Sequence, residues 1–284
     1  MKHSKESTFI GVDLGGTKLR VGKFSNLDLI SASSYPVSAD ASEEVVLDEI
    51  YAAIDTLFDE NVKAIGLAVP SVVDVEKGII YNVENIPSWQ EVHLKELFEK
   101  RYKVDVFVNN DANAFVLGEA YSGKGKSYKN IVGLTLGTGM GCGIVIDGKL
   151  YNGSNCGAGE IGTMKYADHT LEYYGSGEFF KGEFGVDGAE LYRKAKENDE
   201  NAFKAFEAFG EKFGEIIMIV LYTYDPDMII IGGSVSKSYK YFEKSMRKKL
   251  KEFAYPHIIE KIKIEISEHD NIPLVGAIGL CFDI

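Results

Sequence analysis

Phe9–Phe24, with the sequence FIGVDLGGTKLRVGKF, is the stretch that decides the fold. Apolar residues alternate up to Asp13, a Gly-Gly pair turns the chain, and a second alternating run follows. This pattern predicts a β-hairpin with a glycine-rich tip. Asp13, Thr17 and Lys18 give the tip a carboxylate, a hydroxyl and a cation. Because glycine lets a ligand approach the backbone closely, the exposed N–H groups of such a tip can hold phosphate oxygens.

Asp13 separates two interpretations of this tip. Its carboxylate would repel bare phosphate, so a phosphate site makes sense if a divalent cation lies between the two groups. The alternative is an ordinary hairpin turn, since short glycine motifs have many false matches. From this stretch alone, both interpretations stay open.

Composition and charge narrow the class of protein. The 284 residues are enough for one large domain or two of ordinary size. A net charge of −12, with no basic block beyond Arg247–Lys251, argues against a nucleic-acid partner. No apolar run approaches the roughly 20 residues that span a bilayer. The N-terminal residues MKHSKEST lack the apolar segment of a signal peptide. We therefore expect a cytoplasmic protein with no membrane partner.

The cysteines carry no recognisable framework. Cys142, Cys156 and Cys281 are too few and too scattered for a disulfide scaffold or a CxxC zinc site. Free thiols in a reducing cytoplasm are the simplest interpretation.

Strands and helices are expected to alternate along the rest of the chain, which predicts an α/β layered fold. The residues expected in strands are 29–37, 64–69, 79–81, 104–108, 130–136, 141–146, 149–151, 228–231 and 261–266. A turn is expected at Asp147-Gly148. Two helices are expected to follow start signals, one a capping box at Asp40 and Glu43 and the other Ser88 with Glu91. Further helices are expected over 112–121, 199–223, 238–253 and 273–282, with two short ones within 175–197.

An internal echo suggests duplication. One constant offset matches Gly11, Leu14 and Gly15 to Gly133, Leu136 and Gly137. Both segments then read as strand, glycine tip, strand, and helices follow each. Two similar α/β halves, each offering a glycine-rich hairpin to a shared cleft, would explain the match. Chance agreement at three positions is the alternative.

The glycine-rich segments and the polar loop residues of this chain suit a nucleotide and a hydroxyl-rich ligand. Two glycine tips and the pair Gly232-Gly233 after a buried strand could contact a nucleotide. Asp111, in NNDANA, is either a helix N-cap or a general base that accepts the proton of a hydroxyl attacking a γ-phosphoryl group. Trp89 is expected in the core. Polar loop residues that could bond sugar hydroxyls, each alone also compatible with a solvated loop, are Asn85, Asn110, Glu160 and Glu172.

Taken together and in this order, the motifs resemble the ROK family of sugar kinases and repressors over essentially the whole chain. The motifs are DLGGTK (13–18), GLAVPSVVD (66–74), NIPSW (85–89), NNDANA (109–114), LGTGMGCG (136–143), GEIG (159–162) and IIIGGSVS (229–236). The resemblance implies the duplicated actin-like, ribonuclease-H-like fold, with two domains around a cleft that holds ATP and sugar. We expect a smaller domain over 1–110 and a larger one over 111–272, with the helix in 273–284 packing back on the first. A homodimer or homotetramer is also implied.

The resemblance assigns roles by position. Asp13 would help to hold Mg²⁺ through phosphate and water, with Gly15, Gly16, Thr17 and Lys18 around it. Gly137, Thr138 and Gly139 would form the second phosphate loop, and Gly232 and Gly233 would meet the adenosine. Asn85, Asn110, Asp111, Glu160 and Glu172 match sugar-contacting positions, and Asp111 matches the catalytic base.

This chain departs from the family at the sugar end. The family usually has a histidine directly after GEIG that serves both sugar and zinc, and here the residue is Thr163. The cysteine-rich zinc motif is replaced by KYADHTLEYYGSG at 165–177, where His169 alone cannot make a four-ligand site. We therefore predict no structural zinc. Glu172 matches the glutamate after the lost cysteines, so its sugar contact is expected to survive.

Three functions compete. The first is an ATP- and Mg²⁺-dependent kinase acting on a hexose hydroxyl, expected at C6, with glucose ahead of N-acetylmannosamine, fructose and other hexoses. The second is a DNA-binding repressor, disfavoured because the hairpin starts near residue 9, where a helix-turn-helix domain would precede it, and the charge is −12. The third is a non-catalytic sugar-binding or regulatory protein, suggested by Thr163 and disfavoured by Asp111.

Overall fold

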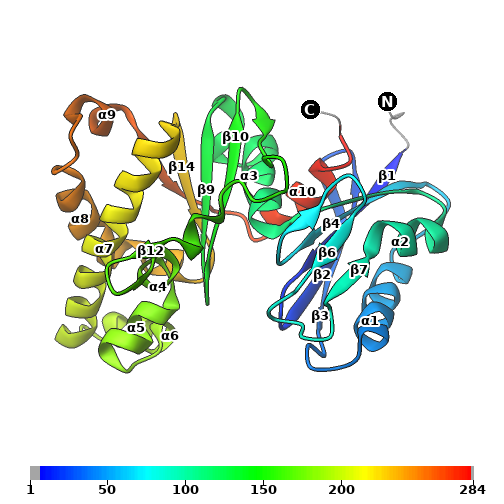
Figure 1. The fold of residues 1–284 in the computed structure, drawn as a ribbon, viewed down its shortest axis with the longest axis horizontal. Helices are drawn as coiled ribbons and strands as arrows, with labels where there is room; N and C mark the ends of the chain where they lie inside the picture. The colour runs from blue at the N-terminus through cyan, green and yellow to red at the C-terminus, as the bar shows by residue number, and fades with distance from the viewer. Residues whose placement is uncertain (1–6, 283–284) are drawn as a thin grey trace. The chain divides into compact units, whose positions relative to one another are not determined.

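The computed structural model describes residues 7–282, which divide by their contacts into two compact units (Figure 1). Within the described residues, unit 1 contains 7–126, Lys149–Ala158 and 269–282. Unit 2 contains Ser127–Gly148 and Gly159–Glu268. Residues 111–126, 149–158 and 269–272 thus lie in unit 1, whereas the sequence led us to expect them in the second domain.

The sheet of unit 1 is built on the glycine hairpin. Its strands lie in the order β3 (Asp28–Pro36), β2 (Lys18–Ser25), β1 (Thr8–Leu14), β4 (Val62–Val69), β8 (Asp105–Asn110). β1 and β2 are antiparallel, with Asp13 opposite Arg20, so the predicted hairpin is confirmed. β4 and β8 run parallel to β1, which brings the ends of β4 and β8 to the same edge as the hairpin tip.

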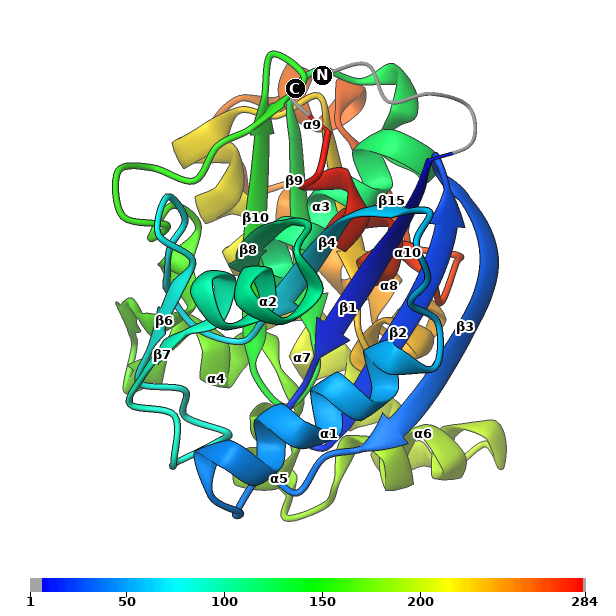
Figure 2. The same cartoon turned by 90° about the vertical axis from the view of Figure 1, so that its right-hand side faces the viewer.

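One face of this sheet is covered by α1 (Glu43–Asp55) and α2 (Leu94–Tyr102) (Figure 2). Residues of β1 that point to this side, Ile10 and Val12, share a core with both helices and with the fully buried Trp89. A small antiparallel sheet of β5 (Val73–Asp74), β6 (Ile79–Tyr81) and β7 (Glu91–His93) completes this side.

Two expected helix starts in unit 1 were wrong. The N-cap of α1 is Ser42, so the pair of Asp40 and Glu43 does not form the predicted capping box. The helix expected behind Ser88 begins only at Leu94, because Glu91–His93 pairs with β6 as a strand.

The other face of the sheet is covered by α10 (Ile272–Gly279), which also packs on α3 (Asp111–Ser122). Backbones meet directly here. A Cβ atom on Gly66 would lie 1.8 Å from the carbonyl oxygen of Ala277, and one on Gly276 would lie 1.6 Å from that of Ala114. Glycine is therefore required at both contacts, which explains the small residues of this region.

Unit 2 repeats the strand order of unit 1. β10 (Met140–Ile146), β9 (Ile131–Leu136), β14 (Met228–Gly232) and β15 (Lys263–Ile266) lie in the order β10–β9–β14–β15, as β2–β1–β4–β8 do. In both units an antiparallel hairpin is followed by two strands parallel to its first strand. The matched topology supports duplication over chance as the cause of the internal echo.

The predicted turn after β10 is confirmed. Asp147 and Gly148 have φ angles of 52° and 78°, as a tight hairpin turn requires, and β11 (Lys149–Leu150) follows.

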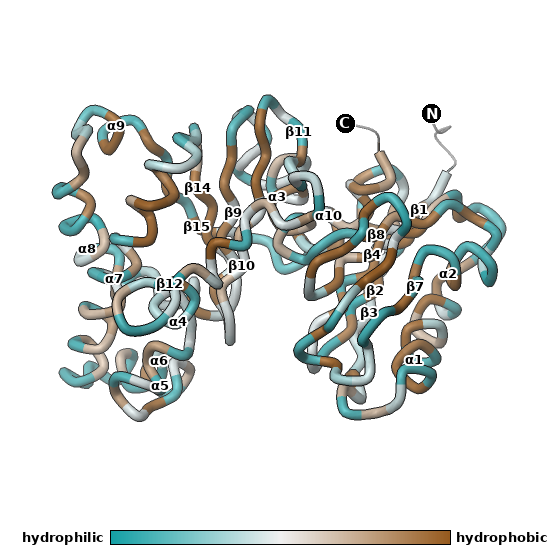
Figure 3. The backbone as a smooth tube through the Cα atoms, in the orientation of Figure 1, coloured by the Kyte–Doolittle hydropathy of each residue, from teal (hydrophilic) through white to brown (hydrophobic). Residues whose placement is uncertain are grey.

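The helices of unit 2 are rich in aromatic residues. α7 (Glu200–Tyr224) and α8 (Tyr239–Leu250) pack through buried rings that include Phe209, Phe213 and Phe242. Both helices alternate hydrophobic and hydrophilic residues (Figure 3), as expected for helices with one buried face. Within residues 7–282, each helix is either too short or too polar to span a bilayer.

The remaining elements of unit 2 are short. The two helices expected within 175–197 are α5 (Gly177–Phe184) and α6 (Gly188–Lys196). Three further elements were not predicted from the sequence: α4 (Leu171–Gly175), α9 (Pro256–Lys261) and the hairpin of β12 (Lys165–Tyr166) and β13 (His169–Thr170).

Candidate active site

The hairpin tip of unit 1 is closed by its own backbone. The amide of Gly15 donates a hydrogen bond to the carbonyl of Lys18 at 2.9 Å. A Cβ atom on Gly16 would lie 2.7 Å from the Cβ of Asn85, so glycine lets the tip pack against the loop that carries Asn85. The side chains of Thr17, Lys18 and Asn85 are exposed. The structure therefore brings Asn85 beside the predicted phosphate loop.

Asp13 lies on β1 just before the tip. Burial raises the pKa of its carboxyl group, and the cations of Arg20 and Lys18 counter part of that effect. Arg20 is itself held by hydrogen bonds to the carbonyl of Asp270 and to the Oδ1 of Asn271, the latter at 2.6 Å. A carboxylate whose charged form is disfavoured by burial gains most from a nearby cation. Magnesium bound with nucleotide phosphates commonly takes one or two carboxylates, so Asp13 fits such an ion.

The junction of β8 and α3 holds Asp111 as the first helical residue. The N-cap is Asn110, whose Oδ1 accepts hydrogen bonds from the amides of Ala112 (2.8 Å) and Asn113 (3.3 Å). The alternative role of Asp111 as the N-cap is therefore wrong. Its half-buried carboxylate accepts a hydrogen bond from the amide of Ala112 at 2.8 Å, in the first turn of α3.

Asn110 has little spare bonding capacity. The residue is 8% exposed, its side-chain oxygen caps α3, and its Nδ2 donates to the carbonyl of Ser71 at 3.2 Å. One N–H of that amide is left for a ligand. A sugar contact by Asn110 thus stays a prediction.

A buried amide network supports this junction. Asn109 Oδ1 accepts hydrogen bonds from the backbone amide of Asn110 (2.8 Å) and from Asn113 Nδ2 (3.0 Å), while Asn109 Nδ2 donates to Asn152 Oδ1 at 2.9 Å. Sequence reasoning missed Asn109, Asn113 and Asn152. The run of asparagines in NNDANA was the available signal for the first two.

The glycine tip of unit 2 is joined to a second glycine site. The amide of Gly137 donates to the carbonyl of Gly139, and the amide of Gly177 donates to the carbonyl of Gly137, both at 2.9 Å. Gly232 pairs with Thr135 of β9. Gly233 has a φ angle of 85°, and a Cβ atom on it would lie 2.3 Å from the carbonyl oxygen of Leu136. The two predicted nucleotide sites of this unit therefore lie together.

A cavity of about 480 Å³ is lined by Gly137 and Gly177 and by Ser234 and Val235, which follow Gly233 in the chain, whereas Gly139, Gly232 and Gly233 do not line it. This volume is within the roughly 300–1,000 Å³ that small-molecule sites occupy, and an added Cβ on Gly137 would meet no atom within 4 Å. The volume of the cavity is therefore suitable for a small-molecule ligand. Sequence reasoning found Gly137 and Thr138 and missed the other residues that line it, which are Gly177, Glu178, Phe180, Lys181, Asp187, Gly188, Ala189, Tyr192, Ser234, Val235, Lys237 and Ser238.

Glu160 and Glu172 lie close enough to influence each other. The Oε2 of Glu172 accepts a hydrogen bond from the amide of Met140 at 2.9 Å, and a Cβ on Gly139 would lie 2.4 Å from that oxygen. Although Glu160 is exposed at the surface, the neighbouring protein partly desolvates its carboxyl group, and this desolvation and then the charge of Glu172 raise the pKa of that group. The Oγ1 of Thr163 donates to the carbonyl of Glu160 at 3.0 Å. The structure thus brings together the predicted sugar residues of unit 2.

The segment 165–177 folds without a recognisable metal site. The ring of His169 stacks on that of Tyr173 with centroids 3.8 Å apart. Among the described residues, no three or more His, Cys, Asp or Glu side chains gather as metal ligands would.

The absence of structural zinc stays a prediction. We expect elemental analysis of the purified protein to find no stoichiometric zinc, because His169 is the only histidine or cysteine in residues 165–177. One zinc ion per chain would contradict this expectation.

Comparison with known proteins decides the family. The ROK family model matches residues 9–283. The chain belongs to the ROK family. Glucokinase from Thermotoga maritima is 28% identical over 95% of this chain and 94% of that protein. The xylose repressor from Bacillus subtilis is 25% identical over 87% of this chain and 68% of that protein.

A solved ROK structure extends the comparison. The ROK family glucokinase from Streptomyces griseus, in complex with glucose and AMPPNP, matches with a TM-score of 0.81 and 26% identity, over 95% of this chain and 98% of that one. The expected actin-like ATPase fold of the ROK family is thereby confirmed. Both kinases and repressors occur among these ROK relatives, so activity must be argued from the site.

Proposed function

We propose that this ROK protein is an ATP- and Mg²⁺-dependent kinase that phosphorylates a hexose, with the C6 hydroxyl of glucose as the first choice. The observation that carries the proposal is the identity of the α3 cap. Asn110 fills the N-cap position, and the carboxylate of Asp111 follows it at the first helical position, where it accepts a hydrogen bond from the amide of Ala112. A half-buried carboxylate held at a helix start is suited to take a proton.

Its relatives support the choice of substrates. Glucokinases are among the similar proteins, and glucose and AMPPNP are bound in one solved relative. We assign the cavity of unit 2, with Gly137–Gly139, Gly232 and Gly233, to ATP. Asn85, Asn110, Glu160 and Glu172 are assigned to sugar hydroxyls.

The proposed reaction is a direct phosphoryl transfer. Asp111 accepts the proton of the sugar hydroxyl while the hydroxyl oxygen of the sugar forms a bond to the γ-phosphorus. At the same time, the bond from that phosphorus to the β–γ bridging oxygen breaks. ADP leaves with the electron pair of that bond. The backbone amides of the two glycine tips and the side chain of Lys18 orient the phosphates. When bound, Mg²⁺ supplies charge neutralisation near Asp13.

A coupled ADP-release assay tests this function. Glucose, N-acetylmannosamine, fructose and other hexoses are compared at saturating ATP and Mg²⁺. We expect ADP release to depend on sugar and to be fastest with glucose. Sugar binding without ADP release from any of them would instead support a non-catalytic ROK protein.

Glu160 gives a prediction on pH. Because the pKa of Glu160 is raised from its ordinary 4.5, Glu160 becomes protonated at a higher pH than a free glutamate does. Protonation weakens it as an acceptor for sugar hydroxyls. The KM for sugar should therefore rise as the pH falls through that pKa. Glu160→Gln, which cannot ionise, should have a higher KM at neutral pH and should lose this part of the pH dependence.

The pH should affect the stability of the folded protein in the opposite way from sugar binding: acidification weakens binding and stabilises the fold. The folded protein holds the proton of Glu160 more tightly than the unfolded chain does, so wild-type stability falls as pH rises from 4.5 to the raised pKa. Glu160→Gln should therefore melt at a higher temperature than wild type at neutral pH. Glu197→Gln, at an exposed surface ion pair with Arg193, is the control. An identical pH profile of KM in wild type and Glu160→Gln would contradict the assignment.

A further inference from the structure

Glu172 lies on a very short helix. This helix is α4, which spans only Leu171–Gly175. An isolated helix of this length is unstable in water, so contacts with the rest of unit 2 must hold it. The side chain of Thr170 caps the helix by accepting a hydrogen bond from the amide of Tyr173 at 3.2 Å. One cap cannot fix the position of Glu172 relative to the sheet.

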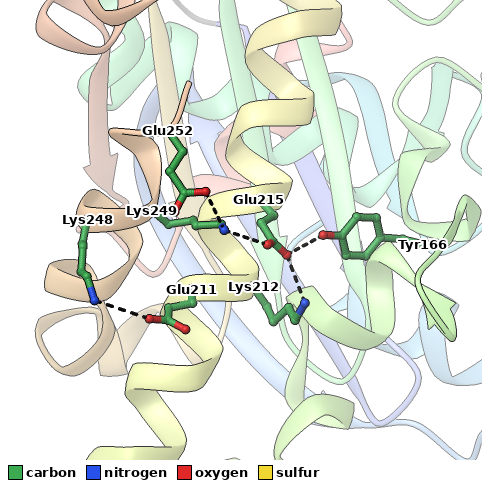
Figure 4. A network of polar contacts seen from close by, with 7 residues as sticks. All are labelled: Tyr166, Glu211, Lys212, Glu215, Lys248, Lys249 and Glu252. Atoms are coloured by element: carbon green, nitrogen blue, oxygen red, sulfur yellow. Dashed lines mark hydrogen bonds and ion pairs between the residues drawn. The ribbon is translucent and has the colours of Figure 1, made fainter. Parts of the chain in front are cut away.

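Polar contacts tie the hairpin before α4 to the long helix α7 (Figure 4). The hydroxyl of Tyr166 donates a hydrogen bond to the Oε2 of Glu215. The same carboxylate takes ion pairs from Lys212 on α7 and from Lys249 on α8, each at 3.2 Å. Tyr166, Lys212, Glu215 and Lys249 are called the α7 anchor below.

Aromatic contacts continue the anchor into α4. The ring of Tyr174, 6% exposed, meets the ring of Tyr166 edge to face with centroids 5.5 Å apart. The ammonium of Lys212 lies 5.3 Å from the centroid of Tyr174 and 5.8 Å from that of Tyr166, within the reach of cation–π attraction. A Cβ on Gly175 would lie 2.5 Å from the sulfur of Met140 and 3.0 Å from Ile216. α4 is therefore pressed between β10 and α7.

The protonation states of the anchor match these roles. Burial and the hydrogen bond to Glu215 raise the pKa of Tyr166 to about 12, so its hydroxyl remains a donor. Burial acts to raise the pKa of Glu215, but the hydrogen bonds from Tyr166, Lys212 and Lys249 outweigh it and lower that pKa. The carboxylate of Glu215 thus stays charged at neutral pH and accepts three donors.

We propose that the α7 anchor positions Glu172 for sugar binding, with Tyr166 as its connecting residue. Tyr166 and Tyr174 fix α4, and α4 directs Glu172 onto the amide of Met140 at the end of the glycine tip. This inference rests on the proposed kinase function for the sugar role of Glu172. The attachment of α4 to α7 does not depend on that function. Tyr166 and Glu215 are positioning residues, since they act on the sugar through Glu172.

Tyr166→Phe tests the anchor with the ring retained. Without the hydroxyl, a charge-assisted hydrogen bond to Glu215 is lost, and we expect the KM for sugar to rise roughly fivefold or more. The KM for ATP and kcat should change less than about twofold, because α4 lines no part of the ATP cavity. Tyr102→Phe is the matched control, since the hydroxyl of Tyr102 also donates to a carboxylate, that of Asp55 at 2.9 Å, in unit 1, which holds no residue of the α7 anchor.

Hydrogen exchange tests the same inference without relying on activity. We expect the amides of residues 171–175 to exchange faster in Tyr166→Phe than in wild type, with the melting temperature nearly unchanged. Unchanged exchange in 171–175 together with an unchanged sugar KM would overturn the inference. A wild-type protein that releases no ADP with any sugar, while exchange in 171–175 still rises in the variant, would refute the kinase function and leave the anchor standing.

Discussion

Replacing Asp111 with alanine is expected to lower kcat by about 10²- to 10⁴-fold, the usual contribution of a general base. The Kd for sugar should change much less, because the sugar keeps Asn85, Glu160 and Glu172. The helix should survive, since its cap is the side chain of Asn110. Single-turnover phosphorylation and titration of the sugar in the absence of ATP measure the two quantities.

Two further variants sharpen this result. Asp111→Asn keeps the size of the side chain and removes the base, so it should lose nearly as much activity as Asp111→Ala. Asp28→Asn, at an exposed strand residue of the same unit, should behave as wild type. Near wild-type turnover of Asp111→Ala would disprove its assignment as the base.

Asp13→Asn is expected to cost activity and to gain stability at the same time. The carboxylate assigned to the magnesium side of ATP is lost, so the rate should fall about 100-fold or more. The Mg²⁺ concentration that gives half of the maximal rate should rise. Burial raises the pKa of Asp13 from 3.8, so the charged form destabilises the folded protein as pH rises toward that pKa. A neutral amide avoids this cost, and the melting temperature at pH 7 should increase.

The two effects are measured separately. Initial rates over a range of Mg²⁺ concentrations give the metal dependence, and thermal unfolding without nucleotide gives the stability. Asp28→Asn is the control, because it changes an exposed carboxylate. Asp59→Asn is not suitable, because it would also remove an ion pair with Lys23. An unchanged Mg²⁺ dependence in Asp13→Asn would contradict the role of Asp13.

The parts of the fold that follow from local pattern could be predicted from the sequence. Alternation and a Gly-Gly pair are enough to define the β1–β2 hairpin, and the buried run at Met228–Gly232 defines a central strand. The capping box failed because a cap depends on backbone angles. Ser42, with φ of −65° and ψ of 158°, is the residue in the extended geometry that a cap needs. Glu91–His93 became a strand because β6 offers it a partner.

The same distinction applies to the site. The position of Asp111 at the end of a strand is local, so the sequence revealed it. Asn152 reaches Asn109 from 43 residues away, and Tyr166 reaches Glu215 from 49 residues away, so neither contact leaves a local pattern. The lining of the cavity by α5 and α6 likewise depends on how these helices pack on α7 and η3, the 3₁₀ turn of Val235–Ser238.

Phosphorus-31 NMR of the protein with ATP, Mg²⁺ and glucose tests the proposed sugar kinase activity most directly, because it identifies the acceptor of the phosphoryl group. We predict that a sugar phosphate monoester forms in step with ADP and that little inorganic phosphate accumulates. Release of inorganic phosphate in place of a sugar phosphate, or intact ATP with glucose and every other hexose, would contradict it.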